Sequence, residues 1–299
     1  MTTVPRRVRL VEVGPRDGLQ NEDATITADD KVAFIDHLSA AACPVIEVGA
    51  FVSPRWVPQM ADTAEVFSRI TRREGTRYTA LVPNLAGLQR AIAARVDEIA
   101  IFAAASETFS RRNINETIDA SLETYRTVCA AARAASIPVR AYVSTAFGCP
   151  FEGAVDPARV RDVSAALIDM GAREVSVSDT IGIAHPGQVP VVVSAVAERV
   201  PLEKIALHFH DTRGTALANV LTALQLGVTT YDSSAGGLGG CPYAPGATGN
   251  LATEDLLYML DGLGIETGVS LAKVLAASQF IEQRLGHPLA SRYAAAVKR

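Results

Sequence analysis

The sequence lacks the cysteine spacing of a disulfide scaffold or of a structural zinc site. Its 299 residues contain four cysteines, Cys43, Cys129, Cys149 and Cys241, and none of them forms a CxxC pair. Scattered thiols are typical of proteins kept in a reducing compartment. We therefore expect free thiols, and any thiol with a special role must be recognised from its surroundings.

A basic excess and long apolar runs are lacking too. The formal net charge is -4, and the longest basic runs are pairs such as Arg72-Arg73 and Arg111-Arg112, so a nucleic-acid partner is not expected. No apolar stretch approaches the roughly 20 residues needed to span a bilayer. No apolar segment of signal-peptide length precedes Pro15. The sequence thus predicts a cytoplasmic protein with no membrane partner.

What the sequence does contain is an alternation of short β-rich runs with amphipathic stretches of helical length, repeated eight times. The expected strands are residues 8–13, 45–48, 77–82, 98–103, 139–145, 174–178, 205–209 and 229–233. Thr27 and Asp156 are placed to cap the starts of helices, the second before a proline. Gly171 and Gly227 stand where a helix ends in a left-handed residue just before the next strand.

Eight such modules suit the length of one closed parallel barrel, about 250 residues. Apolar residues make up 48% of the chain and charged residues 20%, which is enough to build a sizeable core, and no linker interrupts the pattern. We predict a single α/β domain over residues 1–299, a (β/α)₈ TIM barrel. The segment from about 265 to 299 is expected to add extra C-terminal helices outside the barrel.

Polar residues gather at the predicted carboxyl ends of the strands. Asp17 follows the first strand, Glu47 lies at the end of the second, and Asp179 follows the sixth, while His208 and His210 end the seventh. The active sites of TIM barrels form at this rim. The coincidence of these residues at one rim predicts an active site there.

His208 and His210 are two residues apart on a strand, so both rings point to the same face. With the Asp17 carboxylate they supply two nitrogens and one oxygen and leave positions open for water and substrate. The absence of thiolate ligands favours a hard divalent ion, Mg²⁺ or Mn²⁺, over tetrahedral zinc. The alternative is a pair of structural histidines in the core.

Two further residues are candidates for chemistry. Arg16 directly precedes Asp17 and could stabilise a developing oxyanion, or it could pair with a glutamate at the surface. Cys241 lies in the glycine-rich stretch GGLGGCPYAPG after the last strand, where a thiol could serve as an acid, a base or a nucleophile, or be inert. Cys149, after the fifth strand, faces the same rim with less reason to single it out.

Five segments closely resemble the hydroxymethylglutaryl-CoA lyases, within the wider group of metal-dependent TIM-barrel lyases and Claisen-type synthases. They are VEVGPRDGLQNE, IEVGAFVSPRWVPQMAD, VSVSDTIG, LHFHDTRGTALAN and GGLGGCPYAPGATGNLATEDLLYML. The RDG and HxH elements are shared with isopropylmalate and homocitrate synthases. The GGLGGCP stretch with NLATED is narrower and points to the lyases.

The resemblance implies a larger metal site than the strand pattern predicts. It implies that Asp17, His208, His210 and Asn250 ligate the metal ion. Glu254 follows Asn250 by about one helical turn and is expected to support it.

The resemblance also implies roles around that metal site. Arg16 is expected to bind the thioester carbonyl and stabilise the enolate of acetyl-CoA, and Cys241 is expected to be catalytic. Glu47 and Asp179 match acidic residues of the family's active site. Gln20 matches a residue close to metal and substrate.

The implied reaction is the cleavage of hydroxymethylglutaryl-CoA to acetoacetate and acetyl-CoA, in a homodimer with a role in leucine degradation. The base that removes the hydroxyl proton is Asp17 or His208, and the sequence does not choose between them. The alternatives are a lyase for a related 3-hydroxy-3-alkylglutaryl-CoA, a Claisen-type synthase that uses a 2-keto acid, and a non-catalytic sensor of CoA esters.

Overall fold

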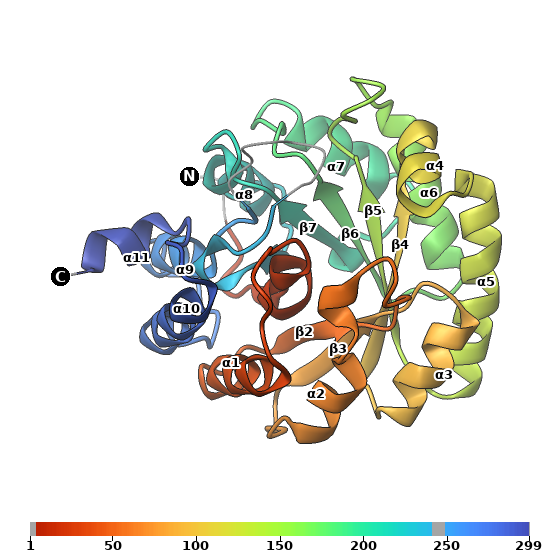
Figure 1. Ribbon diagram of the computed structural model, residues 1–299. Coiled ribbons are helices and arrows are strands. Elements are labelled where there is room, and N and C mark those ends of the chain that lie inside the picture. Colours follow the sequence, from red (N-terminus) through yellow and green to blue (C-terminus); the bar gives the residue numbers. More distant parts are fainter. Residues whose placement is uncertain (1–3, 241–248, 299) are drawn as a thin grey trace.

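A computed structural model describes residues 4–240 and 249–298. Eight parallel strands close into a barrel in sequence order (Figure 1). They are β1 (Arg9–Glu12), β2 (Val45–Ala50), β3 (Arg77–Leu81), β4 (Glu98–Ala104), β5 (Val139–Ser144), β6 (Glu174–Asp179), β7 (Ile205–Phe209) and β8 (Thr230–Ser233). The predicted TIM barrel is confirmed.

Helices surround the barrel (Figure 1). They are α1 (Ala28–Ala40), α2 (Thr63–Arg69), α3 (Leu85–Ala93), α4 (Glu107–Ile114), α5 (Ile118–Ala134), α6 (Pro157–Asp169), α7 (Val189–Ala197), α8 (Ala216–Gln225), α9 (Thr253–Gly262), α10 (Leu271–Leu285) and α11 (Arg292–Val297). In the described part of the chain, none of them is both long and apolar enough to cross a membrane.

The helix boundaries follow the local signals in the sequence. The side chain of Thr27 accepts a hydrogen bond from the backbone of Asp30 at the start of α1, and Asp156 caps α6 in the same manner. Gly171 and Gly227 adopt φ angles of 107° and 91°. These left-handed residues end α6 and α8 and turn the chain into the next strand.

Strand β2 is longer than its sequence pattern predicts. It continues to Ala50, and its register with β3 shifts between Glu47 and Gly49. Glu47 therefore lies inside a buried strand and not at its end, which corrects the sequence-based placement. A Cβ at Gly49 would lie 2.6 Å from Thr63 Oγ1 of α2, so the close approach of α2 to this strand requires a glycine at that position.

The last three helices, α9, α10 and α11, lie together on one side of the barrel (Figure 1, blue). Helix α10 packs against α1 and α9, and α11 packs against α9. The carboxylate of Asp255 at the start of α9 accepts hydrogen bonds from Ser291, Arg292 and Tyr293. These bonds attach the C-terminal segment next to the loop that follows β8.

Candidate metal centre and active site

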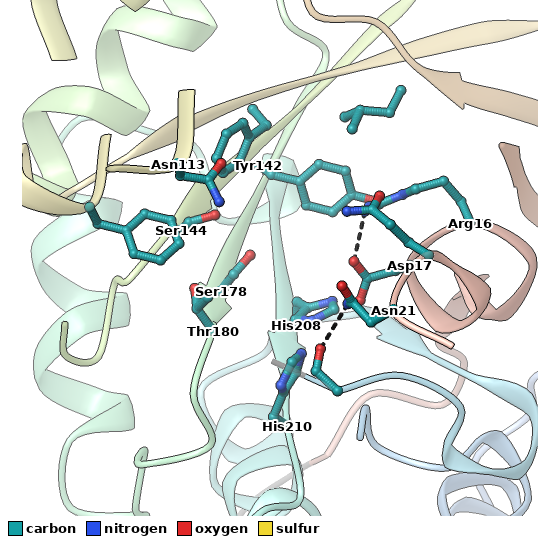
Figure 2. A pocket seen from close by; sticks show the side chains of 15 residues that line it. Arg16, Asp17, Asn21, Asn113, Tyr142, Ser144, Ser178, Thr180, His208 and His210 are labelled. Carbon is teal, nitrogen blue, oxygen red and sulfur yellow. Dashed lines mark hydrogen bonds and ion pairs between the residues drawn. The ribbon is translucent and has the colours of Figure 1, made fainter. Parts of the chain in front are cut away.

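A pocket opens at the carboxyl ends of the strands, where TIM barrels place their active sites. Figure 2 shows Arg16 and Asp17 across the pocket from Ser178 and Thr180, with His208 and His210 between them. Its lining residues are Arg16, Asp17, Gln20, Asn21, Leu81, Phe102, Phe109, Asn113, Tyr142, Ser144, Ser178, Thr180, His208, His210 and Gly240.

The turn after β1 brings Arg16 and Asp17 to the pocket. Residues Gly14–Gly18 form one π-helical turn, in which the carbonyl of Val13 accepts N–H groups from three successive residues at 2.8–3.2 Å. A side chain at Gly14 would lie 2.7 Å from Glu12 Oε1, and one at Gly18 would lie 2.8 Å from Leu238 Cβ. Both glycines are therefore needed for this close turn, which is a common device at functional sites.

Asp17, His208 and His210 form a group whose potential ligand atoms all lie within 4.8 Å of one another. Asn250 joins them, because its Nδ2 donates to Asp17 Oδ2 at 2.9 Å. Among the described residues, His210 Nδ1 and Asn250 Oδ1 are buried without a hydrogen-bond partner, and such orphaned acceptors are costly unless a ligand satisfies them. One carboxylate, two imidazoles and one amide oxygen fit a divalent metal ion.

The electrostatics of this group keep two of the side chains in the forms that bind a cation. Burial by itself would raise the pKa of Asp17, but Arg16 and the two histidines lower it to about 2. Burial and the neighbouring His208 lower the pKa of His210 to about 4. At neutral pH the group therefore offers an ionised carboxylate and an uncharged imidazole, as metal binding requires.

Arg16 is held rigidly beside the metal group and is only 8% exposed. Its Nη1 donates to Asp17 Oδ1 at 2.7 Å and its Nε to Glu47 Oε1 at 2.5 Å. The hydroxyl of Tyr142 donates to the other oxygen of Glu47, and the guanidinium lies 5.6 Å from the centre of the Tyr142 ring. The structure therefore excludes the alternative of a surface arginine.

Residues 7–281 match the HMGL-like family. The chain belongs to that family. It is 54% identical to the mitochondrial hydroxymethylglutaryl-CoA lyase of Rattus norvegicus over 296 residues, which cover 99% of this chain and 91% of the relative. The hydroxymethylglutaryl-CoA lyase structure from Pseudomonas aeruginosa superposes with a TM-score of 0.97 at 53% identity, with 98% of each chain covered. An Acinetobacter baumannii structure in complex with coenzyme A and 3-methylmalate gives 0.94 at 37% identity, covering 100% of this chain and 98% of that one.

Two acidic residues singled out from the family resemblance do not line the pocket. Glu47 is 1% exposed and is occupied by Arg16 and Tyr142. Asp179 ends β6, and its carboxylate accepts the backbone N–H groups of Ile183 and Ala184 at 3.0 and 3.1 Å. Burial outweighs these bonds and raises the pKa of Asp179 to about 6. Both carboxylates fix neighbouring groups in place.

Glu254 supports a different segment from the one expected. Its carboxylate accepts the N–H of Gly236 and the hydroxyl of Ser278. Asn250 Nδ2 donates to the carbonyl of Leu238 at 3.0 Å in addition to Asp17. Glu254 therefore links α9 to the loop after β8 and to α10, and it reaches Asn250 only through the position of that loop.

Of the two cysteines considered for this site, the structure describes only Cys149. Cys241 lies outside the described residues, although Gly240 just before it lines the pocket. Cys149 is 3% exposed and is not among the residues that line the pocket; its Sγ lies 2.9 Å from Ser106 Oγ. Gln20 lines the pocket as the resemblance implies.

Sequence reasoning missed most of the opposite wall of the pocket. Ser144 and Ser178 lie on β5 and β6, and the rule that placed Asp179 at the rim could also have found them. Phe109 and Asn113 belong to α4, which follows β4. No motif in the sequence marks these residues as close to the histidines.

Proposed function

We propose that this chain cleaves 3-hydroxy-3-methylglutaryl-CoA to acetoacetate and acetyl-CoA, with Mg²⁺ or Mn²⁺ held by Asp17, His208, His210 and Asn250. The observation that carries the proposal is that the buried Arg16 contacts Asp17, and that Asp17 forms with His208 and His210 a group able to bind a metal ion in the same pocket. It occurs in a chain more than half identical to a hydroxymethylglutaryl-CoA lyase.

In this reaction the bond between C2 and C3 of the acyl group breaks. The C3 hydroxyl loses its proton and becomes the ketone of acetoacetate, and the electron pair moves onto the thioester as an enolate. A bound divalent ion supplies Lewis acidity that lowers the pKa of the hydroxyl. The hydroxyl proton passes to a base beside it, and of the two candidates we assign this step to Asp17. A carboxylate that binds the ion through one oxygen keeps a second basic oxygen, whereas His208 has no lone pair left if Nε2 binds the ion and Nδ1 carries a proton.

Arg16 faces the negative charge that develops on the thioester oxygen. Glu47 and Asp17 fix its guanidinium before the substrate arrives, so little reorganisation is needed in the transition state. Donors of this kind contribute about 3 kcal/mol. Glu47 does not line the pocket and acts by holding Arg16, while Tyr142 lines the pocket and also holds Glu47 through its hydroxyl.

The enolate must finally be protonated at carbon to give acetyl-CoA. We assign this proton to Cys241, directly or through water, because it directly follows Gly240 at the edge of the pocket. Cys241→Ser should fold and bind metal but lose most turnover, since a serine hydroxyl is a much poorer acid. Cys149→Ser is the matched control, and full activity of Cys241→Ser would move the role to another group.

The CoA part of the substrate needs a path out of the pocket. A second cavity adjoins the first and shares Gln20, Leu81, Phe102 and Asn113 with it. Its walls also carry Arg111, Arg112 and Trp56, and Trp56 is 86% exposed. We propose that CoA lies along this cavity with its phosphates near the two arginines.

Exchange of both arginines tests this path. Arg111→Gln with Arg112→Gln should raise KM for the CoA thioester about tenfold or more, because contacts with phosphate are lost. The corresponding pantetheine thioester, which lacks the nucleotide, should show no such change. Equal losses for both thioesters would contradict the assignment.

The proposal also includes the oligomeric state, the cellular location and the domain organisation. We propose a homodimer, from the family resemblance, and a cytoplasmic location, which the buried free thiols of Cys43, Cys129 and Cys149 support. We also propose that residues 1–299 form one domain with 265–299 as its helical appendage. Light scattering and limited proteolysis test the dimer and the domain.

The decisive experiment is a coupled assay of a panel of 3-hydroxyacyl-CoA esters with Mg²⁺ and with Mn²⁺. Hydroxymethylglutaryl-CoA should give the highest kcat/KM, with acetoacetate and acetyl-CoA in equal amounts. A higher kcat/KM for an ester with a longer 3-alkyl group would identify that ester as the substrate instead. Condensation of acetyl-CoA with a 2-keto acid, without cleavage, would indicate a synthase.

A further inference from the structure

A buried carboxylate lies behind one of the metal-ligand histidines. Asp232 on β8 is the register partner of His208 on β7, and its Oδ2 lies 3.3 Å from His208 Nδ1. The two side chains are 2% and 7% exposed. His208 therefore has one ring nitrogen facing a carboxylate, and the other is available to the pocket.

Asp232 is held by a frame of other buried groups. Arg140 on β5 donates to its Oδ1 at 2.6 Å and to its Oδ2 at 3.3 Å, and Ser176 on β6 donates to Oδ2 at 2.9 Å. Arg140 is itself fixed by Glu174, whose Oε1 accepts its Nε at 2.7 Å. With partners at both oxygens, the Asp232 carboxylate has no free rotation.

This frame also keeps Asp232 ionised. Two N–H groups of Arg140 and the hydroxyl of Ser176 donate to the two oxygens of Asp232, and donors at both oxygens favour the ionised carboxylate. An ionised carboxylate can only accept hydrogen bonds. The Nδ1 of His208 must then carry the proton in the neutral ring, which leaves the lone pair on Nε2.

We propose that Asp232 is a positioning residue that fixes the tautomer and the ring orientation of His208, so that Nε2 is ready to bind the metal ion. The inference rests on the metal site of the proposed function. Metal-bound histidines commonly donate their second N–H to a carboxylate or carbonyl, which orients the ring and raises its basicity. The distance of 3.3 Å between Asp232 Oδ2 and His208 Nδ1 is just outside the usual range of a hydrogen bond, and His208 Nδ1 has no other hydrogen-bond partner among the described residues.

The substitution Asp232→Asn tests the tautomer directly. Because Arg140 donates to Oδ1 at the shortest distance, the amide oxygen of the asparagine should take that place. The amide NH₂ then replaces Oδ2 and faces His208 Nδ1, which forces the proton to Nε2. Mn²⁺ affinity, titrated by electron paramagnetic resonance without substrate, should fall about 10- to 100-fold.

Glu174→Gln is the matched control. It changes a buried carboxylate that binds the same Arg140, but none of the described contacts joins Glu174 to His208. Its Mn²⁺ affinity should stay within about threefold of wild type, even if its melting temperature falls. Wild-type affinity in Asp232→Asn, or an equal loss in Glu174→Gln, would overturn the positioning role.

A measurement on the wild type keeps the proposal testable if Asp232→Asn does not fold. The chain has five histidines, so ¹⁵N-histidine long-range spectra can be assigned by single substitutions. In the metal-free protein, at a pH where the ring is neutral, His208 should carry its proton on Nδ1. A proton on Nε2 would overturn the inference. Neither experiment uses turnover, so failure of the lyase assay would be recognised separately.

Discussion

Arg16 is fixed by Glu47 and by Asp17, which is a proposed metal ligand. Substitution of Arg16 can therefore separate its proposed role in the transition state from an effect on metal binding. Arg16→Gln should lower kcat about 100-fold or more, because its charge acts as negative charge develops in the transition state. Metal affinity should be kept, since Arg16 is not a member of the proposed ligand group and the two histidines and Asn250 still favour the ionised form of Asp17. Steady-state kinetics and Mn²⁺ titration check the two effects.

Tyr142→Phe serves as the control for Arg16. It removes the hydroxyl bound to Glu47 but keeps the contact between Arg16 and Glu47. Its loss of kcat should be about tenfold at most, because one supporting hydrogen bond is worth about 1 kcal/mol. Parallel loss of metal and turnover in Arg16→Gln would mean that the arginine is structural.

His210 provides a second residue-scale prediction. His210→Ala removes one nitrogen ligand from a group whose atoms lie within 4.8 Å of one another. The variant should lose tight Mn²⁺ binding and nearly all turnover, because the substrate hydroxyl is no longer held in place. His185→Ala, at an exposed position, should leave both unchanged. Tight Mn²⁺ binding by His210→Ala would remove it from the ligand set.

At the scale of elements, one glutamate joins the turn after β1 to the loop after β8. Glu12 Oε1 accepts the N–H groups of Gly14 and Ala235, both at 2.9 Å, and Oε2 accepts the hydroxyl of Thr253 at 2.7 Å. These segments carry Asp17 on one side and lead to Asn250 on the other. Glu12 therefore sets the spacing across the metal group without touching it.

This connection predicts a pH dependence of stability. Burial raises the pKa of Glu12 from 4.5 to about 7, so between these values the folded protein holds a proton that the unfolded chain releases. Stability from this group is then lost as pH rises from about 4.5 to 7. Glu12→Gln, whose amide can donate to Thr253, should gain up to about 3 kcal/mol over wild type across that range.

Urea unfolding of the metal-free proteins at pH 5 and pH 8 measures this difference. Glu123→Gln, with a side chain 73% exposed, is the control and should differ from wild type equally at both pH values. A constant difference between Glu12→Gln and wild type would show that Glu12 is ionised throughout.

At the scale of the whole molecule, the metal group depends on closure of the barrel. Asp17 and Asn250, which are joined by a hydrogen bond, are 233 residues apart in sequence, and β1 pairs with β8 to bring them together. A ligand set of this kind exists only in the folded chain. Metal binding should therefore stabilise the whole fold.

The expected gain is about 2.7 kcal/mol when free Mn²⁺ is 100 times its dissociation constant. For a chain of this size the melting temperature should rise by roughly 5 °C. Calorimetry with and without Mn²⁺ measures the shift, and His210→Ala at the same Mn²⁺ concentration should show almost none. An equal shift in that variant would place the stabilising ion elsewhere.

The sequence by itself determined the barrel and the three converging ligands. Strands of a parallel barrel are buried on both faces and read as short apolar runs, and β7 spans the same residues as its sequence pattern predicts. The spacing of His208 and His210 and the position of Asp17 after β1 are local features. The rule that barrel sites form at one rim then brings them together.

Only the tertiary structure decided which carboxylate supports which group. Glu47 reaches Arg16 across 31 residues, and Asp232 reaches Arg140 across 92. Glu254 binds Gly236 and Ser278 instead of its near neighbour Asn250. No spacing rule predicts these partners, because each depends on strand register and helix packing between distant segments, and burial makes every unpaired charge costly enough to select one arrangement.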